Sequence, residues 1–542
     1  MGSPAKGVWW QHHRGFESLL LRHKKGKDLL VFLFFAYYLL LTCPAKLEER
    51  RRIVNCKVYS LPMHEIEKKF PARFVERISK ILPKNELETF LKNATEPLPK
   101  TIRLNNQFVQ QQGWHLQKTV FPNMFFIDRD DRQEIPLGRT DAHFCGEIYS
   151  QSMSSVLPVK ILDPQPKEKI LDLCAAPGSK TTAIAEKLEN SGVVVANEMS
   201  SSRAKKLAAN IDRMGAQNVV IIQNDGTYLN TFFDQEFDKI LVDAPCSSEA
   251  FGRRNSKFFE RMWHEKNIFA SAKIQKKLLE SAFKMCRPDG EIVYSTCTSA
   301  PEENEAVVQY LCSKFGDSVE ILPIELPKNL LFRNGVKEWG NEKFDKEISK
   351  NVIRIWPHLK NELWNSEQFF CAKIRKVKPL KDLPEKKTSS KKSPIKIFGK
   401  NAGAETMTRI RKKFGIDRAV FGKHSLLEKN GDIFITTKAA ASFATKNPHR
   451  RAGMKIVDQD GNFSTEFAVK FGREATKNIF EMTKEQKLKF LAGFDLFLDK
   501  TIEIKNGEPV FMRHEGRCFG VGKIMDNGKK IKNKLDRTWI LR

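Results

Sequence analysis

Short apolar runs alternate with helical patterns between residues 170 and 374, and few folds fit this alternation. The runs cover residues 169–173, 193–198, 219–223, 239–243 and 291–296, and each is long enough for one buried strand. Apolar strands separated by helices are typical of a doubly wound parallel sheet. The sequence therefore predicts an α/β core of the Rossmann type over residues 166–376.

A loop containing Gly178 follows the first run, where a strand passes into a helix. Gly178 allows the backbone to approach a ligand closely, and Ala175 and Ala176 keep side chains out of the way. Glu198 ends the next strand, where a carboxylate can accept hydrogen bonds from ribose hydroxyls, and Asp225 after the third strand can cap an adenine. The phosphate-binding patterns GxGxxG and GxxxxGK[ST] are absent. We therefore expect S-adenosylmethionine, which carries adenosine without phosphate.

Two cysteines follow neighbouring strands, Cys246 in the string Asp-Ala-Pro-Cys and Cys297 in Ser-Thr-Cys-Thr. A thiolate can add to C6 of a cytosine and make C5 nucleophilic. A single buried cysteine is usually a small apolar residue, and we interpret Cys145, Cys286, Cys312, Cys371 and Cys518 in that way. Cys246 and Cys297 should instead flank one pocket, with Asp243 beside them to hydrogen-bond the base edge. The sequence thus predicts covalent attack on a pyrimidine ring, with Cys297, Cys246 and Asp243 as catalytic residues.

These strings resemble the Sun/Nop family of RNA cytosine-5 methyltransferases from about residue 101 to about residue 376. Residues 136–138, 146–151, 196–198 and 301–305 are most similar to its bacterial RsmF group, which modifies small-subunit ribosomal RNA. The resemblance implies a class I S-adenosylmethionine-dependent core in which Cys297 is the nucleophile and Cys246 helps to release the product. It also implies cofactor contacts by Cys174, Ala175, Ala176, Pro177, Gly178, Ser179, Lys180, Glu198, Asp225 and Asp243.

The chain departs from the family pattern at Ser248 and Ala250, where glycine is usual. If those glycines required positive φ, this loop is strained or reshaped. Both cysteines and the cofactor loop are intact, so an active enzyme is favoured over a catalytically weak RNA-binding ribosome-assembly factor. A tRNA substrate remains an alternative to 16S rRNA, because both kinds of enzyme share this core.

Two other cytosine-modifying classes fit the sequence less well. A zinc cytidine deaminase would need HxE and PCxxC ligands, which are missing. A DNA cytosine methyltransferase uses a single Pro-Cys nucleophile and would not need Cys297. We therefore expect no metal.

The charge of the chain indicates a polyanionic partner. The 542 residues include 93 Lys and Arg against 65 Asp and Glu, which gives a net charge of +28. Because this excess extends over regions with apolar patterns, we interpret it as RNA binding rather than solubility alone. The ten cysteines form no CxxC pair, and reduced thiols favour a cytoplasmic protein. We expect it to act as a monomer.

The N-terminal segment, residues 1–62, is atypical. Its apolar run over residues 29–41 is too short for a bilayer-spanning helix, which needs about 20 residues. Residues 15–18 match one reading frame of the T-arm of a tRNA gene. A start codon assigned too early is therefore favoured over a membrane anchor, and no stable membrane association is expected.

Three further segments complete the predicted organisation. Residues 63–165 form a small N-terminal α+β domain for RNA binding, with Phe70, Phe74, Ile78 and Leu82 on one helical face. Residues 377–413 are a basic linker. Residues 414–542 form a β-rich domain that resembles a PUA-like RNA-binding module. Its strands include residues 501–504, and it ends in a hairpin around Asn527 and Gly528.

Overall fold

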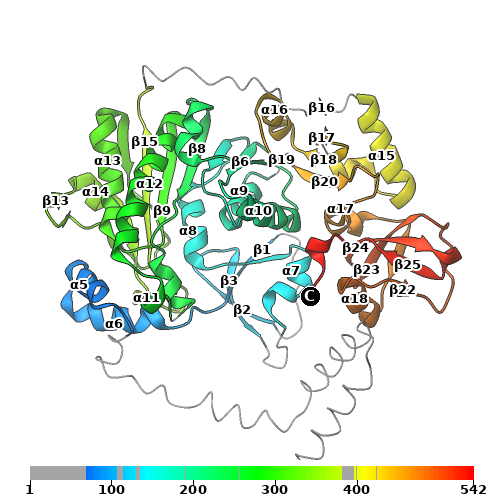
Figure 1. Ribbon diagram of the computed structural model, residues 1–542, viewed down its shortest axis with the longest axis horizontal. Coiled ribbons are helices and arrows are strands. Elements are labelled where there is room, and N and C mark those ends of the chain that lie inside the picture. The colour runs from blue at the N-terminus through cyan, green and yellow to red at the C-terminus, as the bar shows by residue number, and fades with distance from the viewer. Residues whose placement is uncertain are drawn as a thin grey trace, which may run out of the picture. The chain divides into compact units, whose positions relative to one another are not determined.

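The computed structural model describes residues 69–105, 114–129, 135–189, 191–255, 257–380, 396–397, 400–422 and 424–541 (Figure 1). The predicted tail over residues 1–62 lies outside this part of the chain, as does most of the lysine-rich stretch after residue 380.

A ten-stranded sheet contains all five predicted strands. They are β5 (Lys169–Asp172), β6 (Val193–Asn197), β7 (Val219–Ile222), β8 (Phe237–Asp243) and β9 (Cys286–Thr296), and adjacent members pair in parallel. The strand order is β11-β14-β15-β9-β8-β5-β6-β7-β19, with β10 paired to β15. The outer strands are β10 (Val319–Leu322), β11 (Arg333–Asn334) and β14 (Ile353–Ile355). β15 (Phe369–Lys376) runs antiparallel to β9. Because β6 and β8 lie on opposite sides of β5, a ligand crevice is expected at the carboxyl ends of β5 and β8.

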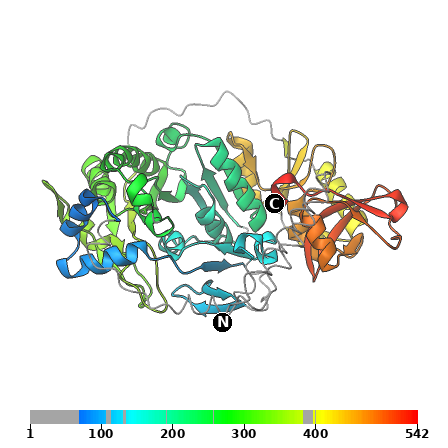
Figure 2. The same ribbon diagram turned by 60° about the horizontal axis from the view of Figure 1, so that its bottom comes forward.

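Helices lie on both faces of this sheet (Figures 1 and 2). Alternate residues of β6 enter two different cores, Val193 and Val195 on one face and Val194 and Ala196 on the other. The first core includes residues of α12 (Glu265–Met285) and α13 (Glu305–Phe315). The second includes residues of α8 (Met153–Leu162), α9 (Ser179–Lys187) and α10 (Ser201–Met214). The predicted α/β class is confirmed.

The N-terminal part contains two helices and a separate four-stranded sheet. α5 (Ala72–Ile81) buries Phe74 and Ile78, as their helical spacing predicts, and Phe74 packs on Phe259 and Trp263. α6 (Lys84–Thr95) follows. The antiparallel sheet has the order β2-β3-β1-β4, formed by β2 (Trp114–Lys118), β3 (Met124–Arg129), β1 (Thr101–Leu104) and β4 (Ile148–Ser150).

Folded structure in the C-terminal part begins before the predicted boundary at residue 414. α15 (Lys400–Phe414) lies within the segment predicted as a linker, and its Ile410 and Phe414 are fully buried. The prediction of a linker as far as residue 413 was therefore wrong for this helix. Met407, Ile410 and Phe414 share one helical face. These three apolar residues lie among many basic ones, so the sequence pattern indicated the helix only weakly.

Two sheets and three helices make up most of the rest of this part, and the helices are α16 (Lys438–Lys446), α17 (Thr465–Phe471) and α18 (Lys484–Leu491). The first sheet has the order β16-β17-β18-β20 and the second β21-β23-β24-β25-β22. The predicted final hairpin is present, with Asn527 and Gly528 at positive φ between β24 and β25. The strand predicted over residues 501–504 is wrong, since Ile502 and Ile504 pack on a core without forming a strand. The bounds are β16 (Lys396–Ile397), β17 (Ser425–Lys429), β18 (Asp432–Thr436), β20 (Met454–Val457), β21 (Ile479–Glu481), β22 (Leu496–Phe497), β23 (Pro509–His514), β24 (Arg517–Met525) and β25 (Lys530–Asn533).

The C-terminal part also extends the catalytic sheet. β19 (Arg451–Ala452) pairs antiparallel with the outer edge of β7. Thr436 Oγ1 donates to the carbonyl of Gln217 at 2.7 Å. Arg451 makes a two-pronged ion pair with Asp212 of α10, with one Nη1–Oδ2 distance of 2.6 Å. Contacts at β7 and α10 therefore hold this part of the chain against the central sheet.

Replacing Arg451 by alanine should lower the free energy of unfolding by about 3–5 kcal/mol, because Asp212 is only 7% exposed and would lose its partner. Urea denaturation of the full chain measures this change. Lys446→Ala, at an exposed position of α16 (Lys438–Lys446), is the matched control. Equal effects of the two substitutions would show that the ion pair does not stabilise this contact.

Candidate active site

The loop between β5 and α9 depends on one glycine. Gly178 has a φ of +107°, and a Cβ added there would lie 3.0 Å from Leu207 Cδ1. Arg203 of α10 donates from Nη2 to the carbonyl of Ala176 at 2.8 Å. The absence of a side chain at Gly178 therefore lets the loop lie close to α10, and the hydrogen bond from Arg203 holds it there.

Asn197 joins three strand ends at this edge of the sheet. Its Nδ2 donates to the carbonyls of Leu173 at 3.1 Å and Asn224 at 3.0 Å, and its Oδ1 accepts from the amide of Asn224 at 3.1 Å. The sequence prediction omitted Asn197, although a polar residue that closes an apolar strand is a usable signal. Asn197 fixes the segments that carry the predicted cofactor residues.

Seven of the predicted cofactor residues line one pocket, together with Asp172. Gly178, Glu198 and Asp225 lie outside that lining. Glu198 is buried after β6 and accepts from the amide of Ser200 at 2.9 Å, and Asp225 caps a short helix through Thr227. The lining residues are Asp172, Cys174, Ala175, Ala176, Pro177, Ser179, Lys180 and Asp243.

Asp172 is a pocket residue that the sequence prediction did not include. It is 1% exposed, and its Oδ2 accepts from Thr181 Oγ1 at 2.7 Å, while its Oδ1 has no hydrogen-bond partner. Burial raises the pKa of Asp172 to about 7. The pocket therefore contains an unpaired acceptor that a cationic ligand could satisfy.

Lys180 links the cofactor loop to the predicted catalytic residues. Its Nζ lies 2.6 Å from Asp243 Oδ2, and Asp243 Oδ1 accepts from Ser295 Oγ at 2.9 Å. Burial alone would lower the pKa of Lys180, but the charge of Asp243 and the hydrogen bond to it outweigh burial and raise this pKa. A thiolate at Cys297 would raise it further. The ammonium of Lys180 is therefore placed to favour negative charge on that sulfur, a role that the sequence did not suggest.

The two predicted catalytic cysteines lie side by side. β8 and β9 are parallel neighbours with Asp243 opposite Ser295, and this register brings Cys246 Sγ to 3.1 Å from Cys297 Sγ. Both thiols are free and partly exposed. The hydrogen bond to Cys297, followed by burial, raises the pKa of Cys246 well above its ordinary value. Cys246 is therefore a neutral thiol near pH 7 and can donate to the sulfur of Cys297.

Hydrogen bonds join the loops that carry the two cysteines. Ser247 Oγ lies 2.9 Å from Thr298 Oγ1, and the amide of Ala250 donates to the carbonyl of Cys297 at 3.0 Å. Ser248 adopts the left-handed conformation, with a φ of +59° and a ψ of 35°, which costs a non-glycine residue about 1–2 kcal/mol. Ala250 lies in the helical turn η4 (Glu249–Arg253) and needs no positive φ. Of the two departures from the family pattern, only Ser248 is strained.

Glu303 is a buried carboxyl that forms a hydrogen bond with the loop of Cys246. It is fully buried, and its Oε2 accepts from the amide of Ser247 at 2.9 Å and from Gln275 Nε2 at 2.8 Å. Its Oε1 has no partner, and burial raises the pKa of Glu303 to about 7. The sequence signal was present in residues 301–305, but it gave no role to this carboxyl.

Glu303→Gln should make stability less dependent on pH. The carboxyl ionises near its ordinary pKa of 4.5 when unfolded but near 7 when folded, so the unfolded state binds fewer protons between these values. The free energy of unfolding therefore falls as pH rises towards 7. Between pH 5 and 8 the wild type should lose up to about 3 kcal/mol more than Glu303→Gln. Urea denaturation tests this, with the exposed Glu325→Gln as control, and equal pH dependence of wild type and Glu303→Gln would refute it.

Two kinds of feature are absent from the described residues. No group of three or more His, Cys, Asp and Glu side chains within them is arranged to hold a metal ion. None of the described helices is both long enough and apolar enough to cross a bilayer.

Comparison with known proteins gives consistent matches. The model of the family "16S rRNA methyltransferase RsmB/F" matches residues 159–375. Ribosomal RNA small subunit methyltransferase F of Vibrio campbellii is 32% identical over 487 residues, covering 87% of this chain and 97% of the relative. The enzyme of the same name from Aeromonas salmonicida is also 32% identical, with the same coverage. A crystal structure of the protein PH0851 matches with a TM-score of 0.50 and 26% identity, covering 58% of this chain and 68% of that one.

Proposed function

The chain belongs to the RsmB/F family of 16S rRNA methyltransferases, and we propose that it methylates C5 of a cytosine in 16S rRNA through a covalent bond from Cys297 to C6. The observation that carries this proposal is the pair of free thiols, with sulfurs 3.1 Å apart, at the ends of β8 and β9. A role in packing alone would not require two thiols next to a pocket that contains Asp243 and Lys180.

The pocket residues suit S-adenosylmethionine, which supplies an electrophilic methyl group when bound. The unpaired Oδ1 of Asp172 is an acceptor for an ammonium group, and a positive charge there would lower the raised pKa of Asp172. Gly178 has a positive φ and packs against Leu207, and so it fixes the loop whose neighbouring residues line the pocket. Glu198 and Asp225 are assigned to the ribose and adenine, because they follow the next two strands.

The nucleophile is assigned to Cys297 because one thiol donor lies next to its sulfur and the charge of Lys180 acts on it. Lys180 contributes positive charge, and the neutral thiol of Cys246 contributes a hydrogen bond. Both interactions stabilise the thiolate, the form that adds to C6. Asp243 can accept from the amino group of the cytosine through lone pairs not used by Lys180 or Ser295.

Cys246 is assigned to product release. After methylation the C5 proton passes to a base, and the C6–S bond breaks with its electron pair returning to Cys297. A thiol donor beside the departing sulfur stabilises that thiolate and so favours release over the adduct. The position of Cys246 Sγ, 3.1 Å from Cys297 Sγ, supports this role, because the donor must reach the departing sulfur.

The RNA partner and cellular setting follow from the family and the charge. The relatives named as small-subunit rRNA methyltransferases support 16S rRNA as the substrate, and the net charge of +28 suits a phosphate backbone. We propose a monomeric cytoplasmic enzyme whose N-terminal and C-terminal parts contribute to RNA binding. tRNA is the alternative substrate.

Transfer of labelled methyl groups tests the proposal. The full chain is incubated with methyl-labelled S-adenosylmethionine and either 16S rRNA or tRNA, each from cells that lack the enzyme. We expect label in 16S rRNA, recovered as 5-methylcytosine after digestion. Label in tRNA alone would establish the alternative substrate, and cofactor binding without transfer to either RNA would instead favour an assembly factor.

A further inference from the structure

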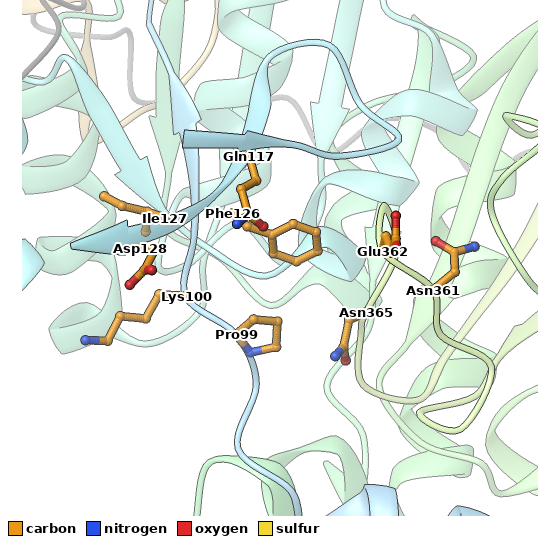
Figure 3. Close-up of a pocket in the computed structure, with 9 residues that line it drawn as sticks. All are labelled: Pro99, Lys100, Gln117, Phe126, Ile127, Asp128, Asn361, Glu362 and Asn365. Carbon is orange, nitrogen blue, oxygen red and sulfur yellow. The ribbon is translucent and has the colours of Figure 1, made fainter. Parts of the chain in front are cut away.

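A second pocket lies between the N-terminal sheet and the loop that precedes β15 (Figure 3). Its volume is about 300 Å³, which is within the range of small-molecule sites. Phe126 of β3 extends into it, between Gln117 on one side and Pro99 on the other (Figure 3). The lining residues are Pro99, Lys100, Gln117, Phe126, Ile127, Asp128, Asn361, Glu362 and Asn365.

The pocket is preformed on the side of the loop. Asn361 Oδ1 accepts from the amide of Leu363 at 2.9 Å, and its Nδ2 donates to the carbonyl of Asn329 at 2.9 Å. The amide of Val120, between β2 and β3, donates to the carbonyl of Leu363 at 3.0 Å. A ligand would therefore meet groups that already have fixed positions, which lowers the entropic cost of binding.

Several polar groups around Phe126 have no partner within the described chain. The side chains of Gln117, Asp128 and Glu362 are exposed and make no hydrogen bond or ion pair there. Two carboxylates against Lys100 give the lining a net charge of −1. This charge disfavours a free phosphate and favours a flat ligand that offers N–H donors to carboxylates.

A chain of hydrogen bonds connects the pocket to the nucleophile. Arg253 of η4 is 5% exposed and donates from Nη1 to Asn365 Oδ1 at 3.2 Å and to the carbonyl of Ser366 at 2.8 Å. The same turn carries Ala250, whose amide holds the carbonyl of Cys297. A ligand in this pocket would thus bind next to a turn that contacts the catalytic cysteine.

We propose that this pocket binds an unpaired guanine of the substrate RNA, away from the target cytosine. The base would stack on Phe126, as bases stack on aromatic side chains in single-strand recognition. Glu362 would accept from the N1 and N2 donors of guanine, and Gln117 would reach the carbonyl at its edge. The inference rests on the proposed function, since it assigns the pocket to the same RNA.

Steady-state methylation of 16S rRNA by pocket variants tests the assignment. Phe126→Leu keeps an apolar side chain but removes the flat ring on which the base would stack. The double variant Gln117→Ala with Glu362→Gln removes the groups that would form hydrogen bonds with the edge of the base. Each variant should raise KM for RNA about tenfold and leave kcat and the cofactor Kd within about twofold. His115→Ala, exposed on β2 but outside the lining, is the control and should change nothing.

Saturation-transfer NMR with guanosine or cytidine, neither of which carries a phosphate, tests the identity of the base. A guanosine signal that is lost in Gln117→Ala with Glu362→Gln would support the proposal. RNA kinetics like the wild type in both pocket variants, or a guanosine signal that persists in them, would overturn it. Absence of methyl transfer by the wild type would refute the proposed function, and the NMR result would then decide on the pocket separately.

Discussion

Replacing Cys297 by alanine is expected to lower methyl transfer by at least about a thousandfold and to abolish any covalent RNA adduct, because Cys297 supplies the sulfur that bonds to C6. The cofactor Kd should stay within about twofold, since Cys297 does not line the pocket of Asp172 and Lys180. Radiolabel transfer and calorimetry measure the two quantities.

A matched control separates this effect from the general loss of a thiol. Cys312→Ala removes a half-buried cysteine of α13 that packs against the core of the sheet and does not line the cofactor pocket, and it should leave transfer unchanged. Substantial turnover by Cys297→Ala would contradict the assignment of the nucleophile. Loss of cofactor binding together with activity would show instead that the substitution disturbs the pocket.

Replacing Cys246 by alanine is expected to trap the enzyme on its RNA. The departing Cys297 thiolate loses the donor that lies 3.1 Å away, so release slows while attack continues with the help of Lys180. A band of low mobility should appear on a denaturing gel after incubation with RNA and cofactor, and turnover should stop after about one cycle. The double variant with Cys297→Ala should show no such band. A stable adduct in Cys297→Ala alone would reverse the two roles.

The C-terminal part should not be removed to test RNA binding, although its charge invites that experiment. β19 covers the edge of β7, and Arg451 pairs with the buried Asp212. Truncation would expose a strand edge and leave Asp212 unpaired, so lost activity would also report damage to the catalytic sheet. Point substitutions on the surface of the intact chain avoid this ambiguity.

The strand ends of the catalytic core could be predicted because their signals are local. Apolar runs locate β5, β6, β7, β8 and β9, and the order expected for such a sheet makes Cys246 and Cys297 neighbours. A glycine between strand and helix likewise locates the loop at Gly178. In these cases a short stretch of sequence determines both the strand and the position of the functional residue that follows it.

The features that were missed depend on contacts between distant segments. α15 has few apolar residues, and its burial needs partners such as Phe511, which stacks on Phe414. The interaction of Lys180 in α9 with Asp243 at the end of β8 joins residues that are 63 positions apart in the chain. The pocket around Phe126 combines four separate stretches of the chain, so no local pattern reveals it. Ser248 is the opposite case, because a local signal was present. Glycine is usual at this position, so the sequence predicted strain there if the backbone required a positive φ, and Ser248 does have a positive φ.

Mapping the covalent bond tests the central claim most directly. The trapped complex of Cys246→Ala with 16S rRNA is digested with nuclease and protease, and the peptide that carries the nucleotide is identified by mass spectrometry. The mechanism predicts a methylated cytosine attached through sulfur to the peptide that contains Cys297. A nucleotide attached to any other residue, or methylated 16S rRNA formed without any covalent complex in this variant, would contradict it.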